Sequence, residues 1–542
     1  MDPWDDDTLA SLFPDAAAIP TAVRLDPASQ PARWLVDGVI TTATRSRPVR
    51  SRVATRDGGT LTPTLLGHEA ELGTDEAAHA IAAARRAWDD GEGAWPRATV
   101  ETRMAAVAAF ATALEQRVDT IANALMWEIG KPHASARDEV LRSIEYIRST
   151  LLELSRLRTD DLAIQHGVAG GVPHHARTHR RALGVVLCVA PFNYPINEFL
   201  TTLVPALLMG NVVIAKTPRF GALANDAMLE AMRDCFPAGA IAMLPGSGRQ
   251  VIPAVMGASQ PDVAGNPTGV VGALAFIGSE TAANAILRAH PTPISLHKVL
   301  GLGAKNAAVV LADADLDAAA AAIVKGALGF NGQRCTAEKI VFVERGRLAA
   351  LLERMVARVD ALTLGMPWTP GVGVTPLPEP DKLASMRALL DDAIAHGATV
   401  RNHDGGRGWF SIMRPAVVAE VTPAMRLYHE EQFGPIVPVA AFDDLEEVLQ
   451  WQRRSPFGQQ AAVWGRPETA RPLVRHLTRY VARVNVNDLC QRGPDSFGFS
   501  ATDKSGFGTL SLREALLAFS RPVLLQARDA DVLDVFTARP GR

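Results

Sequence analysis

The 542-residue chain is poor in cysteine, with four in total, and none stands in a Cys-x-x-Cys pair or beside histidines at the spacing of metal ligands. This pattern is unlike a disulfide framework or a structural zinc site. Unpaired cysteines are typical of proteins in a reducing compartment. We therefore expect no structural disulfide and no bound metal, and we expect the protein to be cytoplasmic.

The sequence also has no run of 18 uncharged apolar residues, and residues 1–7 are acidic where a secretory signal carries positive charge. The charges are balanced, with 55 Lys plus Arg against 58 Asp plus Glu and a formal net charge of −3. No basic block is long enough to indicate nucleic-acid binding. We expect neither a membrane nor a nucleic-acid partner, and a small-molecule ligand is favoured.

A G-x-G-x-x-G is absent too, so the usual dinucleotide fingerprint does not support a cofactor. With 48% hydrophobic residues, the chain can bury more than one core. Helical spacing of apolar residues predicts helices at 75–88, 99–117, 119–129 and 139–157. From residue 184, helices alternate with apolar strand-like runs at 185–190, 212–215, 240–244, 273–277 and 307–311. Such alternation predicts an α/β fold with a mostly parallel sheet.

Two segments fall outside this alternation. Residues 1–70 are rich in Pro, Thr, Arg and Asp, which predicts an extended arm with a few edge strands and no readable function. Residues 164–182 contain four histidines, but no carboxylate or thiolate set accompanies them at ligand spacing. A solvated hairpin is therefore favoured over a metal site in residues 164–182.

The most informative segment is GQRCT at residues 332–336, which places the thiol of Cys335 next to Arg334. A cysteine beside a fixed guanidinium is biased toward the thiolate, the form that attacks carbonyl carbon. Upstream, the X-Pro turn at 191–195 presents Asn193, whose side-chain N–H is a suitable donor for an oxyanion. Taken singly, most free cysteines are buried small hydrophobes, and most asparagines beside proline are turn residues.

Six motifs follow one another along the chain: PFNYP at 191–195, KTP at 216–218, FIGS at 276–279, LGAKN at 302–306, GQRCT at 332–336 and EEQFGPI at 430–436. In order and spacing they resemble the aldehyde dehydrogenase superfamily over about residues 70–525. The resemblance implies an α/β fold with a Rossmann-like cofactor domain, an α/β catalytic domain and a small β hairpin for oligomerisation. It implies an N-terminal arm at 1–70, an NAD(P)-binding domain at 71–163 and 183–300, a catalytic domain at 301–510, and an oligomerisation segment at 164–182 and 511–530.

The resemblance also implies a reaction and an assembly. The Cys335 thiolate attacks a small-molecule aldehyde, Asn193 and the backbone N–H of Cys335 hold the oxyanion, and hydride transfer to a nicotinamide leaves a thioester. The hairpin at 164–182 and a C-terminal strand at about 518–527 would extend a neighbouring subunit's sheet. We therefore expect a homodimer or homotetramer.

The resemblance assigns the cofactor to six residues: Lys216, Arg219, Gly278, Ser279, Glu431 and Phe433. The Gly-Ser turn would bind phosphate, and Glu431 would hold the nicotinamide ribose. Three residues after the matching lysine, NAD-preferring members carry a Glu, where this chain has Arg219. A guanidinium removes repulsion and suits a phosphate in geometry, which predicts NADP rather than NAD. The alternative for Arg219 is an ordinary surface arginine.

Within that superfamily the chain most resembles the non-phosphorylating glyceraldehyde-3-phosphate dehydrogenases. Their phosphate ligands match Arg142, Tyr194, Arg334 and Arg492. Three arginines and a phenol that converge would bind a dianion well, so the match implies a small phosphorylated aldehyde such as glyceraldehyde 3-phosphate. Singly, each arginine is also explained by a structural ion pair.

One expected group is missing. The family's general-base Glu lies 34 residues before the nucleophile, and counting back from Cys335 reaches Gly301. A second carboxylate that some members keep is also absent, with Leu510 near its position. Three interpretations stay open: hydrolysis by another base or a water chain, transfer of the acyl group to coenzyme A or phosphate, or a catalytically impaired relative.

Overall fold

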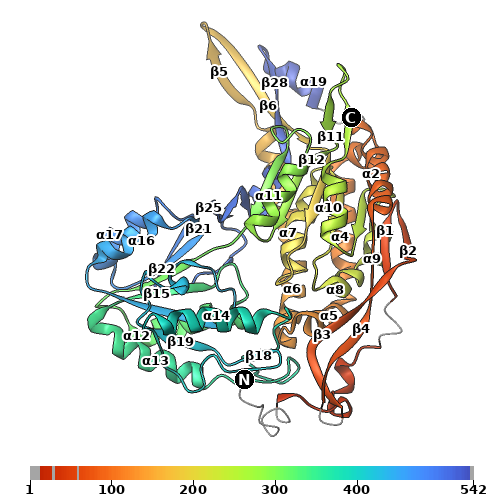
Figure 1. Cartoon of the computed structure of the whole chain (residues 1–542). Coiled ribbons are helices and arrows are strands. Elements are labelled where there is room, and N and C mark those ends of the chain that lie inside the picture. The colour runs from red at the N-terminus through yellow and green to blue at the C-terminus, as the bar shows by residue number, and fades with distance from the viewer. Residues whose placement is uncertain (1–11, 27–30, 58–59, 538–542) are drawn as a thin grey trace.

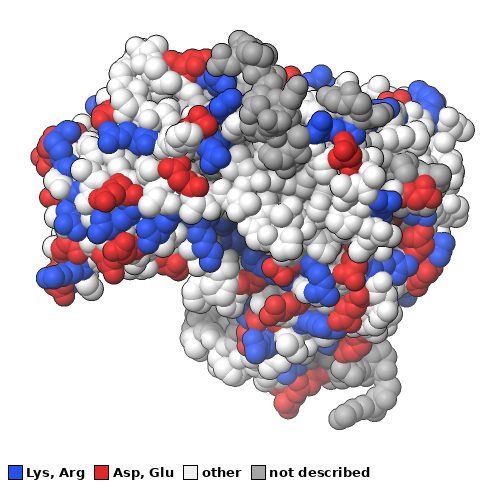
Figure 2. All heavy atoms as spheres, turned by 90° about the horizontal axis from the view of Figure 1, so that it is seen from below, with Lys and Arg blue, Asp and Glu red and all other residues white. Residues whose placement is uncertain are grey.

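Two large β-sheets with helices packed around them make up most of this computed structural model, which describes residues 12–26, 31–57 and 60–537 (Figure 1). Lys, Arg, Asp and Glu side chains are interspersed over the face seen in Figure 2, as the balanced charge of the sequence leads one to expect. In the described part of the chain, no helix has the length and apolar character that a membrane crossing requires.

The first sheet has eight strands in the order β2-β1-β9-β8-β7-β12-β13-β26. Their bounds are β2 (Val39–Thr42), β1 (Arg33–Val36), β9 (Ile241–Leu244), β8 (Val212–Lys216), β7 (Val185–Val189), β12 (Val271–Ile277), β13 (His297–Gly301) and β26 (Gly506–Phe507). The five central strands are parallel, and the outer pairs β1–β9 and β13–β26 are antiparallel. The central strands read as continuous apolar runs because helices bury both faces of a parallel sheet.

Helices from two parts of the chain cover the two faces of this sheet. One face packs against α4 (Val100–Glu115), α5 (Val118–Ile129), α6 (His133–Leu162), α7 (Asn197–Leu208) and α9 (Leu229–Cys235). The other packs against α2 (Thr74–Trp88), α10 (Gly248–Met256) and α11 (Glu280–Ala289). The predicted helices and strands are confirmed, although the helix expected at 139–157 extends from His133 to Leu162.

The second sheet has seven strands in the order β16-β19-β20-β15-β14-β22-β23. Their bounds are β16 (Thr399–Val400), β19 (Ala416–Ala419), β20 (Ile436–Phe442), β15 (Glu338–Glu344), β14 (Asn306–Val310), β22 (Gln460–Trp464) and β23 (Arg483–Val486). All neighbours are parallel except β16 and β19. Helices α12 (Leu316–Leu328) and α13 (Leu348–Asp360) cover one face, and α14 (Lys382–Ala395), α16 (Leu445–Arg454) and α17 (Pro467–Leu477) cover the other. The sequence predicted only β14 in this sheet.

A three-stranded sheet projects from the body at the top of Figure 1. It joins β5 (Gln165–Ala169), β6 (Val172–Ala182) and β28 (Ser520–Ala527), all antiparallel, and α19 (Ala530–Thr537) packs beside it. The predicted hairpin and its pairing with a C-terminal strand are therefore confirmed. The rings of His166 and His175 meet at 4.9 Å, and among the described residues no group of three or more His, Cys, Asp or Glu side chains is placed to hold a metal ion.

The N-terminal arm does more than add edge strands. Its hairpin of β3 (Ser46–Asp57) and β4 (Thr60–Ala70) crosses from one large sheet to the other. Ser51 Oγ bonds the carbonyl of Trp127, while the Ser411 hydroxyl donates to the Arg52 carbonyl at 2.6 Å. Apolar residues of the arm pack against both units in one shared core. The domain boundaries drawn from the sequence stay a prediction.

Candidate active site

The candidate nucleophile lies on a tight loop between α12 and β15. Phe330 and Asn331 have positive φ angles of 51° and 55°, which residues with a Cβ adopt at a cost. Asn331 is held there by reciprocal hydrogen bonds with Thr375 of 3.0 to 3.1 Å. At Gly332, a Cβ would lie 2.4 Å from the Gly434 carbonyl oxygen, so only glycine fits. The loop therefore presents Cys335 in a backbone path that its neighbours determine.

The structure brings the two predicted catalytic residues together. Asn193 is buried and donates from Nδ2 to the carbonyl of Gln333 at 2.9 Å, two residues before Cys335. A side-chain amide has a second N–H, and no described residue accepts it in this arrangement. The carbonyl of Cys335 accepts from Asn306 Nδ2 and from Lys339 Nζ, both at 2.9 Å. Cys335 itself is only partly buried.

A buried ion pair fixes the turn that carries Asn193. Lys131 and Glu139 are almost wholly buried and in close contact. Lys131 Nζ also donates to the Asn193 carbonyl at 3.1 Å, and Glu139 Oε1 accepts the backbone N–H groups of Ile196 and Asn197 at 3.0 and 3.1 Å. The carboxylate thus satisfies free donors where α7 begins, which anchors both the turn and the helix.

The prediction of a thiolate-biased cysteine is wrong. Burial raises the pKa of Cys335 above its ordinary value, and the carboxylate of Glu198 raises it further, while Lys339 and Arg492 act in the opposite direction. Arg334, the expected activating cation, donates instead to Thr336 Oγ1 at 3.1 Å and is not among the groups with the largest effect on that pKa. Desolvation of the thiolate outweighs the nearby positive charge. The loop therefore favours the protonated thiol.

Three of the six predicted cofactor residues face a cleft of about 860 Å³ at the carboxyl ends of the parallel strands, where ligands bind in open α/β sheets. Lys216, Arg219 and Ser279 line it. Ser279 caps α11 by accepting from the Ala282 N–H at 3.3 Å, as the sequence predicted for this turn. At Gly278 a Cβ would lie 2.6 Å from the Phe276 ring, which explains the glycine.

Two arginines of this cleft were not found from the sequence. Arg249, at the start of α10, and Arg47, on the arm, both line it. Arg47 Nε donates to the buried Glu69 at 2.8 Å, and Glu69 Oε1 accepts the Gly246 N–H at 2.7 Å. No local pattern marks Arg47, because its place depends on Glu69, which contacts Gly246 across 177 residues of the chain. Burial lowers the pKa of Lys216 to about 8, with Glu69 opposing and Arg47 adding to the effect.

The predicted nicotinamide residues lie beneath the nucleophile loop. Glu431 forms an ion pair with Lys339 at 3.1 Å, and a Cβ at Gly303 would lie 2.7 Å from Glu431 Oε2. Phe433 meets Phe192 edge-on at 6.0 Å between ring centres. Lys339, which the sequence did not single out, thus links the expected ribose carboxylate with the backbone of the nucleophile.

The predicted phosphate ligands are only partly brought together. Arg492 is buried, and Glu198 forms a close ion pair with it. Arg142 Nη2 lies 3.0 Å from Asp495 Oδ1, and Arg492 Nε lies 3.6 Å from the same oxygen. Burial favours the neutral form of Arg492, but the Glu198 carboxylate reverses this and holds the pKa of Arg492 above its ordinary value. Two of the three arginines are therefore already paired with carboxylates.

The other two predicted ligands lie at the nucleophile loop. The Tyr194 ring meets the Phe330 ring at 6.3 Å, and Lys131 Nζ lies 3.7 Å from its centre. Arg334 contacts Thr336 as described above. Neither forms an ion pair or hydrogen bond with Arg142 or Arg492 among the described residues.

The position of the missing base lies at the end of β13. Gly301 pairs with Ile277 on one side and with Gly506 on the other. A Cβ there would come within 3.3 Å of Ile277 Cγ1, a contact that a small shift of that side chain relieves. The backbone at position 301 therefore does not require glycine. The absence of the family's carboxylate at this position is a difference in chemistry and not a consequence of the local fold.

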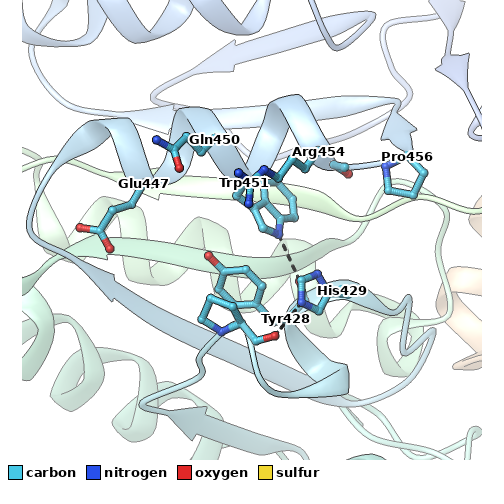
Figure 3. Close-up of a pocket in the computed structure, with 9 residues that line it drawn as sticks. Tyr428, His429, Glu447, Gln450, Trp451, Arg454 and Pro456 are labelled. Atoms are coloured by element: carbon cyan, nitrogen blue, oxygen red, sulfur yellow. Dashed lines mark hydrogen bonds between the residues drawn. The ribbon is translucent and has the colours of Figure 1, made fainter.

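A second hollow, of about 270 Å³, lies between α15 (Arg426–His429) and α16 (Figure 3). Trp451 Nε1 donates to the Tyr428 carbonyl at 3.2 Å, and a ring nitrogen of His429 lies 2.8 Å from the Pro423 carbonyl oxygen. None of the predicted site residues lines it.

Comparison with known proteins agrees with this geometry. Residues 60–523 match the aldehyde dehydrogenase family. The chain is similar to the NADP-dependent glyceraldehyde-3-phosphate dehydrogenases of Nicotiana plumbaginifolia and Streptococcus equinus, at 31% identity to each. The matches cover 78% of this chain and 81% of the Nicotiana protein, and 84% and 91% for the Streptococcus protein. It is also similar to the structure of NADP-dependent glyceraldehyde-3-phosphate dehydrogenase from Bacillus halodurans C-125 complexed with NADP, at 30% identity and a TM-score of 0.81, over 92% of this chain and 99% of that chain.

Proposed function

Since the chain belongs to the aldehyde dehydrogenase family, we propose that it oxidises an aldehyde with NADP through a thioester on Cys335. The observation that carries this proposal is the 2.9 Å hydrogen bond from Asn193 Nδ2 to the Gln333 carbonyl. It holds an N–H donor against the loop of a partly exposed cysteine, and a second N–H of the same amide stays available. A nucleophile with an oxyanion donor beside it is the minimum that acyl transfer requires.

The cleft at the strand ends fits NADP. Lys216, Arg219, Arg249 and Arg47 supply four cationic side chains around it, and Ser279 caps a helix whose first N–H groups suit a phosphate. A guanidinium matches a phosphate bidentately, which supports Arg219 as a contact for the 2′-phosphate. When bound, NADP supplies the acceptor for hydride.

The residues of the pocket then act in sequence. Cys335 gives up its proton to water, and its sulfur bonds to the carbonyl carbon. The free N–H of Asn193 and the backbone N–H of Cys335 hold the oxyanion. As hydride leaves that carbon, the C=O bond reforms and a thioester stays on Cys335. Because the pKa of the thiol is raised, proton loss is a real cost of the first step.

For the substrate we propose a small phosphorylated aldehyde such as glyceraldehyde 3-phosphate. The relatives and the presence of Arg142, Tyr194, Arg334 and Arg492 support it. The paired carboxylates Glu198 and Asp495 weaken it, because they offset two of the three arginine charges. The two other outcomes, acyl transfer to coenzyme A and an impaired enzyme, are kept because position 301 has no carboxylate.

One experiment separates these outcomes. The enzyme is mixed with NADP and either glyceraldehyde 3-phosphate or glyceraldehyde, with and without coenzyme A, and NADPH and the product are measured. Repeated turnover to free acid supports hydrolysis. Turnover only with coenzyme A supports an acylating enzyme, and a single burst indicates impaired deacylation. If no aldehyde gives even a burst of NADPH, the proposed function is wrong.

We also propose self-association through β5, β6 and β28 to a homodimer or homotetramer. Val168, Val523 and Leu524 on these strands are exposed, with 74%, 46% and 57% of their surface accessible. Light scattering of the purified protein tests this, and a monomer at micromolar concentration contradicts it. The cytoplasmic location stays a prediction, which the four unpaired cysteines support.

A further inference from the structure

Glu198 is a buried carboxylate beside the nucleophile loop that no sequence motif indicates. It lies in the first turn of α7, and its N–H donates to the Tyr194 carbonyl at 3.1 Å. The turn before it is tied to the nucleophile loop by the contact between Asn193 and Gln333. Only 7% of Glu198 is accessible. The backbone therefore delivers this carboxylate to the interior of the candidate active site.

The two oxygens of this carboxylate have different surroundings. Oε2 forms the ion pair with Arg492, which in turn contacts Asp495, and Asp495 contacts Arg142. No described residue donates a hydrogen bond to Oε1. Among the charged groups around Cys335, Glu198 acts on the thiol most strongly, ahead of Lys339, Arg492 and Glu431. Arg492 thus fixes Oε2 of Glu198. Oε1 has no hydrogen-bond donor among the described residues, and the charge of the carboxylate acts on the Cys335 thiol.

The other carboxylates near the loop are committed elsewhere. Glu431 pairs with Lys339 and is expected to hold the cofactor. Glu338 Oε1 accepts the Cys490 N–H at 2.6 Å, and Glu338 Oε2 lies against Gly326 in the core, where burial raises the pKa of Glu338 to about 7. Asp495 is shared by two arginines. Glu338 Oε2 and Glu431 Oε1 also accept no hydrogen bond from any described residue, but the first lies in the core and the second pairs with Lys339. Glu198 is therefore the carboxylate whose free oxygen is committed to neither.

We infer that Glu198 is the general base for hydrolysis of the thioester, in place of the carboxylate that is absent at Gly301. Glu198 Oε1 takes a proton from a water, whose oxygen bonds to the thioester carbon. The intermediate collapses, the carbon–sulfur bond breaks, and Glu198 returns the proton to the Cys335 thiolate. The products are a carboxylic acid, which ionises in water, and the thiol. This inference rests on the proposed function, and Arg492 is a positioning residue in it.

The test uses full-length enzyme, NADP and an aldehyde that the wild type oxidises. We expect Glu198→Gln to keep a burst of NADPH stoichiometric with active sites, and to lose about 10²–10⁴-fold in the steady-state rate, the usual contribution of a general base. Glu198→Asp should lose less. Hydroxylamine attacks a thioester without a base, so it should restore turnover of Glu198→Gln. Glu446→Gln is the matched control, because Glu446 is also a first-turn helix glutamate paired with an arginine, on the surface.

Several outcomes overturn the inference. An unchanged steady-state rate in Glu198→Gln does so directly. A folded Glu198→Gln enzyme that loses the burst and is not rescued by hydroxylamine shows a structural role instead. A wild type that turns over only with coenzyme A removes the hydrolytic step but leaves aldehyde oxidation intact, whereas a wild type that forms no NADPH with any aldehyde contradicts the proposed function itself. If Glu198→Gln fails to fold, Glu198→Asp serves as the test, with a full burst and a lower steady-state rate supporting the inference and an unchanged rate overturning it.

Discussion

The cofactor cleft and the catalytic pocket both contain several arginines, but the two sites differ in how many of these arginines are paired with carboxylates. In the cleft, Arg219 and Arg249 are exposed and form no ion pair with any residue that the structure describes. In the pocket, Arg142 and Arg492 are each paired with a carboxylate. The third arginine of the cleft, Arg47, is paired with Glu69. Arg219 and Arg249 therefore offer uncompensated positive charge to an anionic ligand, while the pocket is nearly balanced.

Burial explains the pairing of Arg492, whereas the side chain of Arg142 is 40% exposed. A guanidinium at the surface is hydrated and needs no partner, whereas a buried one without a counter-charge is very costly. Arg492 has only 7% of its surface accessible, and Glu198 compensates it. The same requirement places a carboxylate beside the thiol. A motif that reads as anion binding can thus become a charge-balanced site once its residues are buried.

The largest effect that we expect is that of Cys335→Ala, which should affect the catalytic pocket and not the cofactor cleft. It should reduce aldehyde-dependent NADP reduction by at least about 10⁴-fold, because no covalent path is left, yet leave NADP affinity unchanged. Activity is followed by NADPH absorbance and affinity by fluorescence titration. Cys235→Ala, on the partly buried Cys235 of α9, is the control. If Cys335→Ala keeps an activity near that of the wild type, the pocket around Cys335 does not carry out the reaction.

Asn193→Ala should reduce kcat by about 10²–10³-fold, the usual cost of one oxyanion donor. The pocket would lose a donor while the cleft stays intact, so the dissociation constant of NADP should not change. Alkylation of Cys335 by iodoacetamide shows whether the loop is still formed. A normal alkylation rate together with a kcat within fivefold of wild type would contradict a role for Asn193.

Arg219→Glu should lower the catalytic efficiency with NADP by about 10- to 100-fold, since a charge-assisted contact with a phosphate contributes roughly 1.5–3 kcal/mol. Efficiency with NAD should hold or rise, because repulsion acts on the 2′-phosphate alone. Arg50→Glu, on the exposed Arg50 of the arm, is the matched control. If the NADP-to-NAD ratio does not move, Arg47 and Arg249 remain as the candidates for phosphate recognition.

The smallest expected effect is a pH dependence of the cleft. Burial lowers the pKa of Lys216 to about 8, so the free enzyme loses this positive charge as the pH rises through that value. If the cofactor phosphates favour the protonated lysine, binding takes up a proton above pH 8 and the affinity for NADP falls by less than tenfold per pH unit. Titrations on both sides of pH 8 measure this. The profile should flatten in Lys216→Met, and a flat wild-type profile would contradict the assignment.

The predictable part of the site is the part encoded in short segments. Cys335 and Asn193 could be found because each stands in a local motif, and in the structure Asn193 donates to the Gln333 carbonyl, two residues before Cys335. Helices α2, α4, α5 and α6 and the strands β7, β8, β9 and β12 of the first sheet followed from the spacing of apolar residues, whereas β1, β2, β13 and β26 were not predicted. The pKa of Cys335 could not be predicted, because it depends on how far folding removes water from the thiol. In the second sheet, β16 has only two residues and gives no periodic signal, whereas β15 and β20 are seven-residue, largely apolar strands that were missed although their composition favours a strand.

Arg47 and Glu198 show the other limit. Their contacts join positions far apart in the chain, Glu198 with Arg492 across 294 residues. By itself the sequence determined the α/β class, the family and the candidate nucleophile, because periodicity and motifs are local properties. Only the tertiary structure decided which charges are paired, which buried carboxylate pairs with Arg492 and which arm residue enters the cleft, because burial and electrostatics act through space.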